Sequence, residues 1–353
     1  MTTPTKVALL FGGRSGEHEV SVRSAISVAA GLAGFCDVLP VFIDRDGQWR
    51  LQTGPVPAAG GGELVFLAPT PADGGRLRRV ADASLAASPD IYFPVLHGTY
   101  GEDGTMQGLF ELASVPYVGS GVAASAAGMD KELMKALFAR AGLPQVDYRI
   151  LRRGDDGLRL ARELGLPVFV KPANLGSSVG VSKVKHDDDL APALAAAFAY
   201  DRKVIVEVGI DTREIELSVL GNDGPEASVP GEILPDREFY DYDSKYSADS
   251  RTQLRIPAEL DDATRAAAQE LAVRAFRAVD AAGYARIDFF LERTTGRLLV
   301  NEINTIPGFT SISMFPKLWE ASGLRYDDLL RRLLDLGLER HRERAGLRTD
   351  RGA

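Results

Sequence analysis

Two apolar runs near the C-terminal end of this chain carry polar residues at alternating positions. They span residues 284–292 and 297–304 and are joined by a short turn that contains Gly296. Alternating runs separated by a glycine-containing turn are typical of a β-hairpin, in which successive side chains point to opposite faces. The residues predicted to form its apolar face are Ile287, Phe289, Leu291, Leu299 and Ile303. The chain is therefore expected to contain a sheet that buries one face of this hairpin and leaves the other polar.

Four polar residues are predicted to share that other face. The alternation places Asp288 opposite Glu302, and Arg286 opposite Asn304. Two carboxylates that face each other repel, so a sheet does not keep such a pair without compensation. A divalent cation can supply it, because oxygen ligands from Asp, Glu and Asn suit Mg²⁺, which usually also binds substrate phosphates. The hairpin therefore favours an enzyme with a metal site.

The composition is that of a globular protein with two or three domains. The chain has 353 residues, of which 45% are hydrophobic and 25% are charged, and this length exceeds one typical core. The formal net charge of −8 argues against a general nucleic-acid-binding protein, which needs a basic face. The charge does not argue against nucleotides, because a few local lysines can hold a triphosphate.

The single cysteine and the hydropathy pattern indicate the cytoplasm. Cys36 excludes an internal disulfide framework and suits a reducing compartment, and a buried structural thiol is favoured over a nucleophile. No run of about 20 apolar residues occurs, so no membrane partner is expected. The N-terminal segment is too short for a signal peptide and instead predicts a first β-strand.

The order of the predicted elements indicates an α/β domain at 1–120 followed by two α+β domains at 121–213 and 214–353. The first is predicted to have a parallel sheet, with strands at 7–11, 38–43 and 91–96, a helix at 21–34, and a surface excursion at 54–88. The second is predicted to have helices at 129–141, 158–165 and 190–200 and strands at 146–151, 168–171, 180–184 and 204–208. The third is expected to contain several strands, a helix at 263–282, the hairpin and a final charged helix.

A glycine-rich loop within residues 170–184 is a candidate phosphate site. Its glycines permit close backbone approach, and Ser177 and Ser178 add hydroxyl donors for phosphate oxygens. Lys171 ends the preceding apolar strand and could pair with phosphates as a point charge. Taken alone, the loop fits a plain hairpin turn at least as well as it fits a phosphate site, and its sequence does not match the Walker pattern. Lys131 and the metal hairpin favour the phosphate interpretation.

Two further loops follow predicted strands of the first domain, at the sheet edge where α/β proteins bind ligands. Glu17 lies near a helix start, where it either favours the positive end of the helix dipole or meets a ligand amine. His97 lies in a loop with three nearby glycines, where binding residues concentrate, although a lone histidine is usually structural.

Two segments of the third domain have similarly open interpretations. Residues 239–250 combine tyrosines, aspartates and a lysine without a helix or strand period, which indicates either a surface segment or a lid that closes on substrate. Ser313 lies at a predicted helix start, where it either forms an ordinary N-cap or contributes to an anion site.

Taken together, these segments resemble the D-alanine–D-alanine ligase family of the ATP-grasp superfamily. In family order they are GGRSGEHEVS, LHGTYGEDGTMQG, MDK, VKPANLGSSVG, FYDYDSKY, RIDFF and NEINTIPGFTSIS, and they extend over nearly the whole chain. The resemblance implies an ATP-grasp fold, in which an N-terminal parallel-sheet domain adjoins two α+β domains that clasp ATP.

The resemblance also implies a role for each matching residue. The implied catalytic residues are Glu17, Ser177, Tyr246 and Arg286, the last as the group that stabilises an oxyanion. The implied substrate-binding residues are His97 near the first D-alanine, and Ser313 and Met314 at the second. The implied ATP-binding residues are Lys131, Lys171, Ser178, Glu207, Ile210, Glu214 and Lys245. The implied metal ligands are Asp288, Glu302 and Asn304, which would hold two Mg²⁺ ions, with Mn²⁺ as a substitute.

The implied function is ATP-dependent joining of two D-alanines through an acyl phosphate, for peptidoglycan precursor synthesis by a cytoplasmic homodimer. One alternative is a relative that uses D-lactate or D-serine as the second substrate, but Tyr246 in the lid segment favours an amine nucleophile. Another alternative is a nucleotide-binding regulator without catalysis. The intact set of Arg286, Asp288, Glu302 and Asn304 argues against it.

Overall fold

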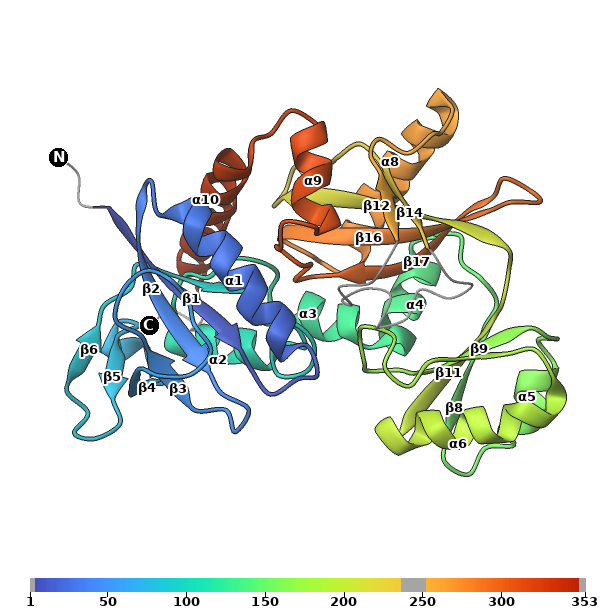
Figure 1. Cartoon of the computed structure of the whole chain (residues 1–353), viewed down its shortest axis with the longest axis horizontal. Coiled ribbons are helices and arrows are strands. Elements are labelled where there is room, and N and C mark those ends of the chain that lie inside the picture. Colours follow the sequence, from blue (N-terminus) through green and yellow to red (C-terminus); the bar gives the residue numbers. More distant parts are fainter. Residues whose placement is uncertain (1–3, 236–251, 349–353) are drawn as a thin grey trace.

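The computed structural model describes residues 4–235 and 252–348, and these residues form three β-sheets with helices packed around them (Figure 1). The mixed α/β architecture agrees with the expected fold class. No helix in the described ranges is long and apolar enough to cross a membrane.

The N-terminal sheet has the strand order β6-β5-β4-β3-β2-β1-β7. Its strands are β1 (Thr5–Gly12), β2 (Cys36–Ile43), β3 (Trp49–Leu51), β4 (Glu63–Leu67), β5 (Leu77–Arg79), β6 (Leu85–Ala87) and β7 (Ile91–Pro94). Strand β1 pairs in parallel with β2 and β7, which confirms the predicted parallel sheet for these three strands. Helices α1 (His18–Leu32) and α2 (Thr105–Ala113) adjoin this sheet.

The rest of this sheet is antiparallel, and it includes most of the segment predicted to be a surface excursion. That prediction was wrong, because residues 54–88 supply β4, β5 and β6. Val65, Leu67 and Leu77 of these strands enter a buried cluster with Ala8 and Tyr92. Strands of three to five residues are too short to show the two-residue period from which a strand is recognised.

The central sheet has the order β10-β9-β11-β8 and is antiparallel throughout. Its strands are β8 (Tyr148–Arg152), β9 (Val168–Pro172), β10 (Ser182–Val184) and β11 (Lys203–Val208), and its helices are α5 (Gly157–Arg162) and α6 (Leu190–Tyr200). Side chains of both helices share one buried cluster with the strands. The predicted order of elements is confirmed here, with boundaries shifted by a few residues.

Two helices connect the first sheet to the central one. They are α3 (Val122–Met129), which the sequence did not predict, and α4 (Lys131–Arg140). Asp130 separates them and caps α4, because its carboxylate accepts hydrogen bonds from the backbone N–H groups of Glu132 and Leu133. Met134 and Phe138 of α4 pack into the core of the C-terminal sheet rather than the central one.

The C-terminal sheet has the order β15-β14-β12-β16-β17, with β13 paired to β12. Its strands are β12 (Thr212–Gly221), β13 (Glu226–Ala227), β14 (Gly231–Leu234), β15 (Gln253–Arg255), β16 (Gly283–Glu292) and β17 (Leu298–Asn304). Helix α8 (Asp262–Ala278) packs on its apolar face, and α9 (Met314–Ala321) contacts β12.

The predicted hairpin is β16 and β17, and its pairing is confirmed where the polar residues lie. Arg286 pairs with Asn304, and Asp288 pairs with Glu302. A β-bulge between Asp288 and Phe289 then shifts the register by one residue, because Phe289 pairs with Val300. Val300 therefore takes the core position beside Phe289, and Leu299, which was predicted to share the face of Phe289, pairs with Phe290 on the opposite face.

The last helix, α10 (Tyr326–Ala345), returns to the N-terminal sheet and lies beside α1 (Figure 1). Leu329, Leu330 and Leu333 of α10 are fully buried in a cluster that also contains Val7 of β1 and Val28 of α1. The two ends of the described chain thus share one core, which fixes the C-terminal sheet against the N-terminal sheet.

Leu333→Ala should lower the free energy of unfolding by about 2–5 kcal/mol, because it leaves a cavity in this shared core. Leu112→Ala is the matched control on helix α2, where the leucine is 62% exposed, and its effect should stay within about 0.5 kcal/mol. Urea unfolding followed by circular dichroism measures both. Equal effects of the two substitutions would contradict the packing of α10 described above.

Candidate active site

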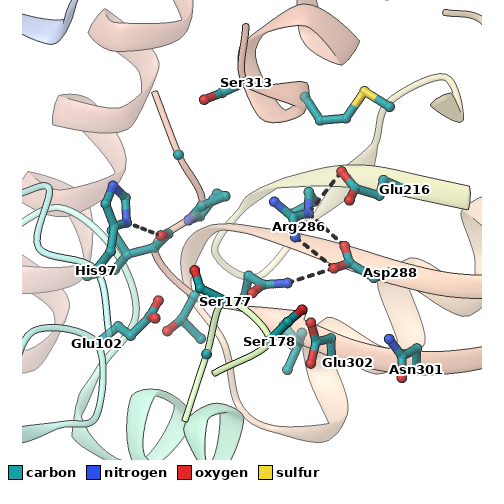
Figure 2. A pocket seen from close by; sticks show the side chains of 18 of the residues that line it. His97, Glu102, Ser177, Ser178, Glu216, Arg286, Asp288, Asn301, Glu302 and Ser313 are labelled. Carbon is teal, nitrogen blue, oxygen red and sulfur yellow. Dashed lines mark hydrogen bonds and ion pairs between the residues drawn. The ribbon is translucent and has the colours of Figure 1, made fainter. Parts of the chain in front are cut away.

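A cavity of about 260 Å³ opens where the three sheets meet. Its walls come from the start of α1, the loop after β7, the first residue of α4, the glycine-rich loop between β9 and β10, the polar faces of β12, β16 and β17, and the loop before α9. Figure 2 shows these side chains converging from both sides of the space. The cavity therefore brings together segments from almost the whole described chain.

Arg286 occupies the centre of the polar face of the hairpin (Figure 2). Its Nε and Nη2 atoms lie 2.7 Å from the two carboxylate oxygens of Asp288, and its Nε lies 3.1 Å from Oε2 of Glu216. Burial alone would lower the pKa of Arg286, but Asp288 and Glu216 raise it well above its ordinary value. The guanidinium therefore stays charged and compensates two of the acids on this face.

Glu216 was not among the residues predicted from the sequence. It lies on β12 directly opposite Asp288 of β16, and it is almost completely buried. The pairing of β12 with β16 joins segments about 70 residues apart in the chain, so no local pattern signals it. The alternation of Glu214 and Glu216 within a strand is the one signal available in the sequence.

The predicted metal ligands lie together on this face, and their chemistry fits a hard divalent cation. Asp288, Glu302 and Asn304 all line the cavity, and Asn304 Nδ2 donates a hydrogen bond of 3.0 Å to Asp288. Within residues 4–235 and 252–348, no cluster of three or more His, Cys, Asp or Glu side chains is arranged to hold a metal. The fit therefore rests on two carboxylates and an amide oxygen, and each carboxylate oxygen has lone pairs for both a hydrogen bond and a metal.

The glycine-rich loop, residues 173–181, lies opposite the hairpin across the cavity (Figure 2). Ser177 and Ser178 both adopt positive φ angles, of 49° and 59°, which L residues rarely take. Lys131 reaches this loop from α4 and donates a hydrogen bond of 2.7 Å from its Nζ to the Leu175 carbonyl. The loop is therefore more than the plain hairpin turn that its sequence also allowed.

Lys171 lies at the cavity wall, and a buried carboxylate fixes its position. Its Nζ lies 2.5 Å from Oε2 of Glu207, whose other oxygen lies 2.7 Å from Nζ of Lys135. Burial would raise the pKa of Glu207, but the two lysines lower it well below its usual range. Glu207 stays ionised between the two lysines and does not line the cavity, and its contact with the nucleoside stays a prediction. Ile210 also lies outside the cavity lining.

Glu17 links the start of α1 to the glycine-rich loop. Its carboxylate accepts a hydrogen bond from the Ser177 hydroxyl, and its side chain makes no capping hydrogen bond to α1. Glu17 thus lies at the N-cap position of α1, near the positive end of the helix dipole, and also contacts Ser177, another of the implied catalytic residues. Tyr246, a third implied catalytic residue, and Lys245 lie outside the described residues.

His97 lines the cavity, but both of its ring nitrogens are engaged by protein atoms. Nδ1 lies 2.9 Å from the Ile306 carbonyl, which can only accept, so Nδ1 carries the proton and Nε2 accepts from Ser24 Oγ at 3.1 Å. Ser24 Oγ in turn accepts a hydrogen bond of 3.3 Å from the Phe309 N–H. Burial lowers the pKa of His97, in keeping with a neutral ring. His97 thus holds the loop before α9 against α1.

That loop carries Ser313 and Met314 to the cavity. Ser313 precedes α9 without making a side-chain cap, so the ordinary N-cap interpretation does not hold. Its Oγ instead accepts a hydrogen bond of 3.0 Å from the Thr310 N–H and lies 2.8 Å from the Thr310 hydroxyl. Met314 lines the cavity beside it, and Glu214 lines it from β12.

Glu102 is a second acid at the Glu17 side of the cavity that sequence reasoning missed. Its Oε1 accepts a hydrogen bond of 2.9 Å from the Gly98 N–H, and Gly98 also lies against the Glu17 carboxylate. Burial and the charge of Glu17 raise the pKa of Glu102 to about 8. The sequence LHGTYGEDG signals an exposed glycine loop, and its fold around the carboxylate was not predictable from that pattern.

Glu102 should make the stability of the protein fall as pH rises. The folded state holds the Glu102 proton up to a pH of about 8, whereas an ordinary glutamate loses it near 4.5. The unfolded chain therefore binds fewer protons in this window, and stability falls by up to about 1.4 kcal/mol per pH unit. Glu102→Gln should flatten this decline in thermal unfolding from pH 5 to pH 9 without ligands. Parallel curves for the two proteins would contradict the assignment.

Comparisons with known proteins agree with this geometry. The chain matches the family model for the D-ala D-ala ligase N-terminus over residues 6–120 and the one for the D-ala D-ala ligase C-terminus over residues 137–335. It is 52% identical to the D-alanine--D-alanine ligase of Heliobacterium modesticaldum, with 98% of each chain covered. It is 50% identical to the protein of that name from Solibacter usitatus, with 96% of this chain and 97% of the relative covered.

Solved structures with the same fold include three ligases. The D-alanine-D-alanine ligase from Coxiella burnetii superposes with a TM-score of 0.86 at 36% identity, over 98% of this chain and 97% of that one. D-alanyl-alanine synthetase A from Vibrio cholerae gives 0.84 at 33% identity, over 96% and 100%. The VanG D-Ala:D-Ser ligase from Enterococcus faecalis gives 0.84 at 32% identity, over 95% and 100%. The chain belongs to the D-alanine–D-alanine ligase family, whose members have the ATP-grasp fold.

Proposed function

We propose that this protein joins two D-alanine molecules at the expense of ATP, through an acyl phosphate, to supply D-alanyl-D-alanine for peptidoglycan precursors. The observation that carries the proposal is the position of Arg286. This guanidinium is held between Asp288 and Glu216 and faces the same cavity as the glycine-rich loop. A fixed cation beside a phosphate-binding loop suits a reaction in which negative charge develops on the oxygen of an acyl group.

The glycine-rich loop and two lysines form the proposed phosphate end of the site. Lys131 and Lys171 bring positive charge to the cavity wall, and Ser177 and Ser178 of the loop line the same cavity, where we assign this segment of the loop to the phosphate oxygens. We assign Glu214, which lines the cavity, to the nucleoside, and we assign Glu207 to the positioning of Lys171.

Asp288, Glu302 and Asn304 are the residues that would hold the divalent cations, two Mg²⁺ ions with Mn²⁺ as a substitute. The cations would supply charge neutralisation for the phosphates of ATP. The chain itself provides the oxygen donors on one rigid sheet face and keeps their repulsion in check with Arg286.

The remaining residues would position the two amino acids. Glu17 places negative charge where the ammonium group of the first D-alanine can bind, and Ser313 faces the cavity near the proposed site of the second carboxylate. The carboxylate of the first D-alanine takes the γ-phosphoryl group. The amine of the second then attacks the acyl carbon, Arg286 stabilises the oxyanion, and phosphate leaves with the C–O bond pair.

The domain and assembly proposals follow the same family pattern. We propose domains at 1–120, 121–213 and 214–353, since each sheet falls almost wholly within one of these ranges. We also propose a homodimer that works in the cytoplasm, where ATP is available.

The function is tested by incubating the protein with ATP, Mg²⁺ and D-alanine and by measuring the dipeptide, ADP and phosphate. D-Alanyl-D-alanine and equal amounts of ADP and phosphate are expected. The same assay with D-serine or D-lactate as the second substrate should give far less product, and an excess of either mixed product would contradict the choice of D-alanine. No phosphate release with any substrate would favour a regulator without catalysis.

Glu302→Gln should lower turnover at limiting Mg²⁺ by at least about tenfold, because it removes a proposed metal ligand. The melting temperature should stay the same or rise, since the substitution also removes a carboxylate opposite Asp288. Glu320→Gln on the exposed side of α9 is the control and should change neither quantity. Turnover of Glu302→Gln equal to that of the wild type across a Mg²⁺ titration would contradict the metal assignment.

A further inference from the structure

Lys203 is a buried lysine that the proposed mechanism does not use. It is the first residue of β11, only 4% of it is exposed, and it does not line the cavity. Its Nζ lies 2.5 Å from Oδ2 of Asp130 and 2.9 Å from Oε2 of Glu132. Burial would lower the pKa of Lys203, but these two carboxylates raise it, so the ammonium group stays charged. Because this cation is buried and has two acidic partners, it fixes the start of helix α4, where Asp130 and Glu132 lie.

Asp130 divides its two carboxylate oxygens between two tasks. Oδ1 accepts the N–H groups of Glu132 at 3.0 Å and Leu133 at 3.2 Å and so caps α4. Oδ2 accepts a hydrogen bond from Nζ of Lys203. The ion pair therefore determines where the first turn of α4 begins, and the residue that begins it is Lys131, the proposed phosphate lysine.

Backbone hydrogen bonds also connect Lys203 to Lys131, through Ala173. The Lys131 N–H donates to the Ala173 carbonyl at 3.0 Å, and the Ala173 N–H donates to the Lys203 carbonyl at 3.1 Å. Strand β11 also pairs with β9, where Ile205 lies opposite Lys171. The backbone of Lys203 thus fixes the strand that carries Lys171, while its side chain fixes the helix that carries Lys131.

We propose that Lys203 is a positioning residue for ATP, which sets the separation of Lys131 and Lys171 by clamping the cap of α4 to the end of β11. The proposal rests on the assignment of both lysines to the phosphates. Loss of the Lys203 charge leaves Asp130 and Glu132 next to each other at the start of α4, without the cation that holds them to β11. The cap then shifts, and Lys131 moves away from the phosphate loop.

The test uses Lys203→Met, which keeps the length of the side chain but removes its charge. Binding of ATP in the presence of Mg²⁺ is measured by calorimetry, and the KM values for ATP and D-alanine are measured in the ligase assay. The Kd and KM for ATP should rise about tenfold, which corresponds to about 1.4 kcal/mol, while the KM for D-alanine changes less than about twofold. Lys203→Arg should restore most of the ATP affinity, because a guanidinium can reach both carboxylates.

Asp130→Asn provides a second route to the same result if Lys203→Met folds poorly. Asparagine remains a good N-cap but loses the ionic contact with Lys203, so its ATP affinity should fall by a similar factor. The double variant should bind ATP no more weakly than Lys203→Met alone, because that single variant already lacks the contact between Lys203 and Asp130. Arg162→Met serves as the control, because it removes an exposed ion pair between Arg162 and Asp187 in the domain of the central sheet. Its ATP affinity should equal that of the wild type.

The outcomes separate this inference from the proposed function. A wild-type protein that binds no ATP would overturn the proposed function itself. ATP binding by the wild type, with equal affinity in Lys203→Met and only a lower melting temperature, would show a purely structural role and overturn the inference. Additive losses in the double variant would also overturn it.

Discussion

The site depends on the placement of one guanidinium among acids that would otherwise repel one another. Arg286 contacts Asp288 on its own strand and Glu216 on the neighbouring strand, and Glu302 lies opposite Asp288 across the hairpin. Removing this charge would leave three carboxylates on one sheet face in a partly dry cavity, where each would carry a desolvation cost of several kcal/mol. The arrangement therefore holds in place the oxygens proposed to bind the metal ions, and it supplies the cation proposed to stabilise the reacting carbonyl.

On the opposite wall of the cavity the charges are reversed, because acidic side chains there hold lysines in place before any phosphate is present. Glu207 lies buried between Lys135 and Lys171, while Asp130 and Glu132 hold Lys203 at the start of α4. None of these three acids lines the cavity, so each neutralises a lysine from outside it. The ammonium groups are consequently positioned by protein contacts that ATP does not need to supply, and that reduces the entropy lost on binding.

Much of this could be predicted from local sequence, and the rest depends on pairing between distant segments. The alternation around Asp288 and Glu302 gave their register correctly, because both strands and their turn are contiguous. The bulge beyond Asp288 was not predictable, since no residue type marks it. Glu216 came to the site only through pairing of β12 with β16, and the motif match did not show that Glu207 lies buried between two lysines, because burial is a tertiary property. Short strands within residues 54–88 lacked the period that would have revealed them.

In the proposed reaction, the carboxylate of the first D-alanine accepts the γ-phosphoryl group of ATP in this cavity. D-Alanine labelled with ¹⁸O in its carboxylate tests it directly, because the oxygen that bonds to phosphorus leaves with the phosphate when the amine attacks the acyl carbon. Mass spectrometry of the released phosphate should find a labelled oxygen, in proportion to the dipeptide formed. Dipeptide formation with unlabelled phosphate would contradict the acyl-phosphate route and the role assigned to Arg286.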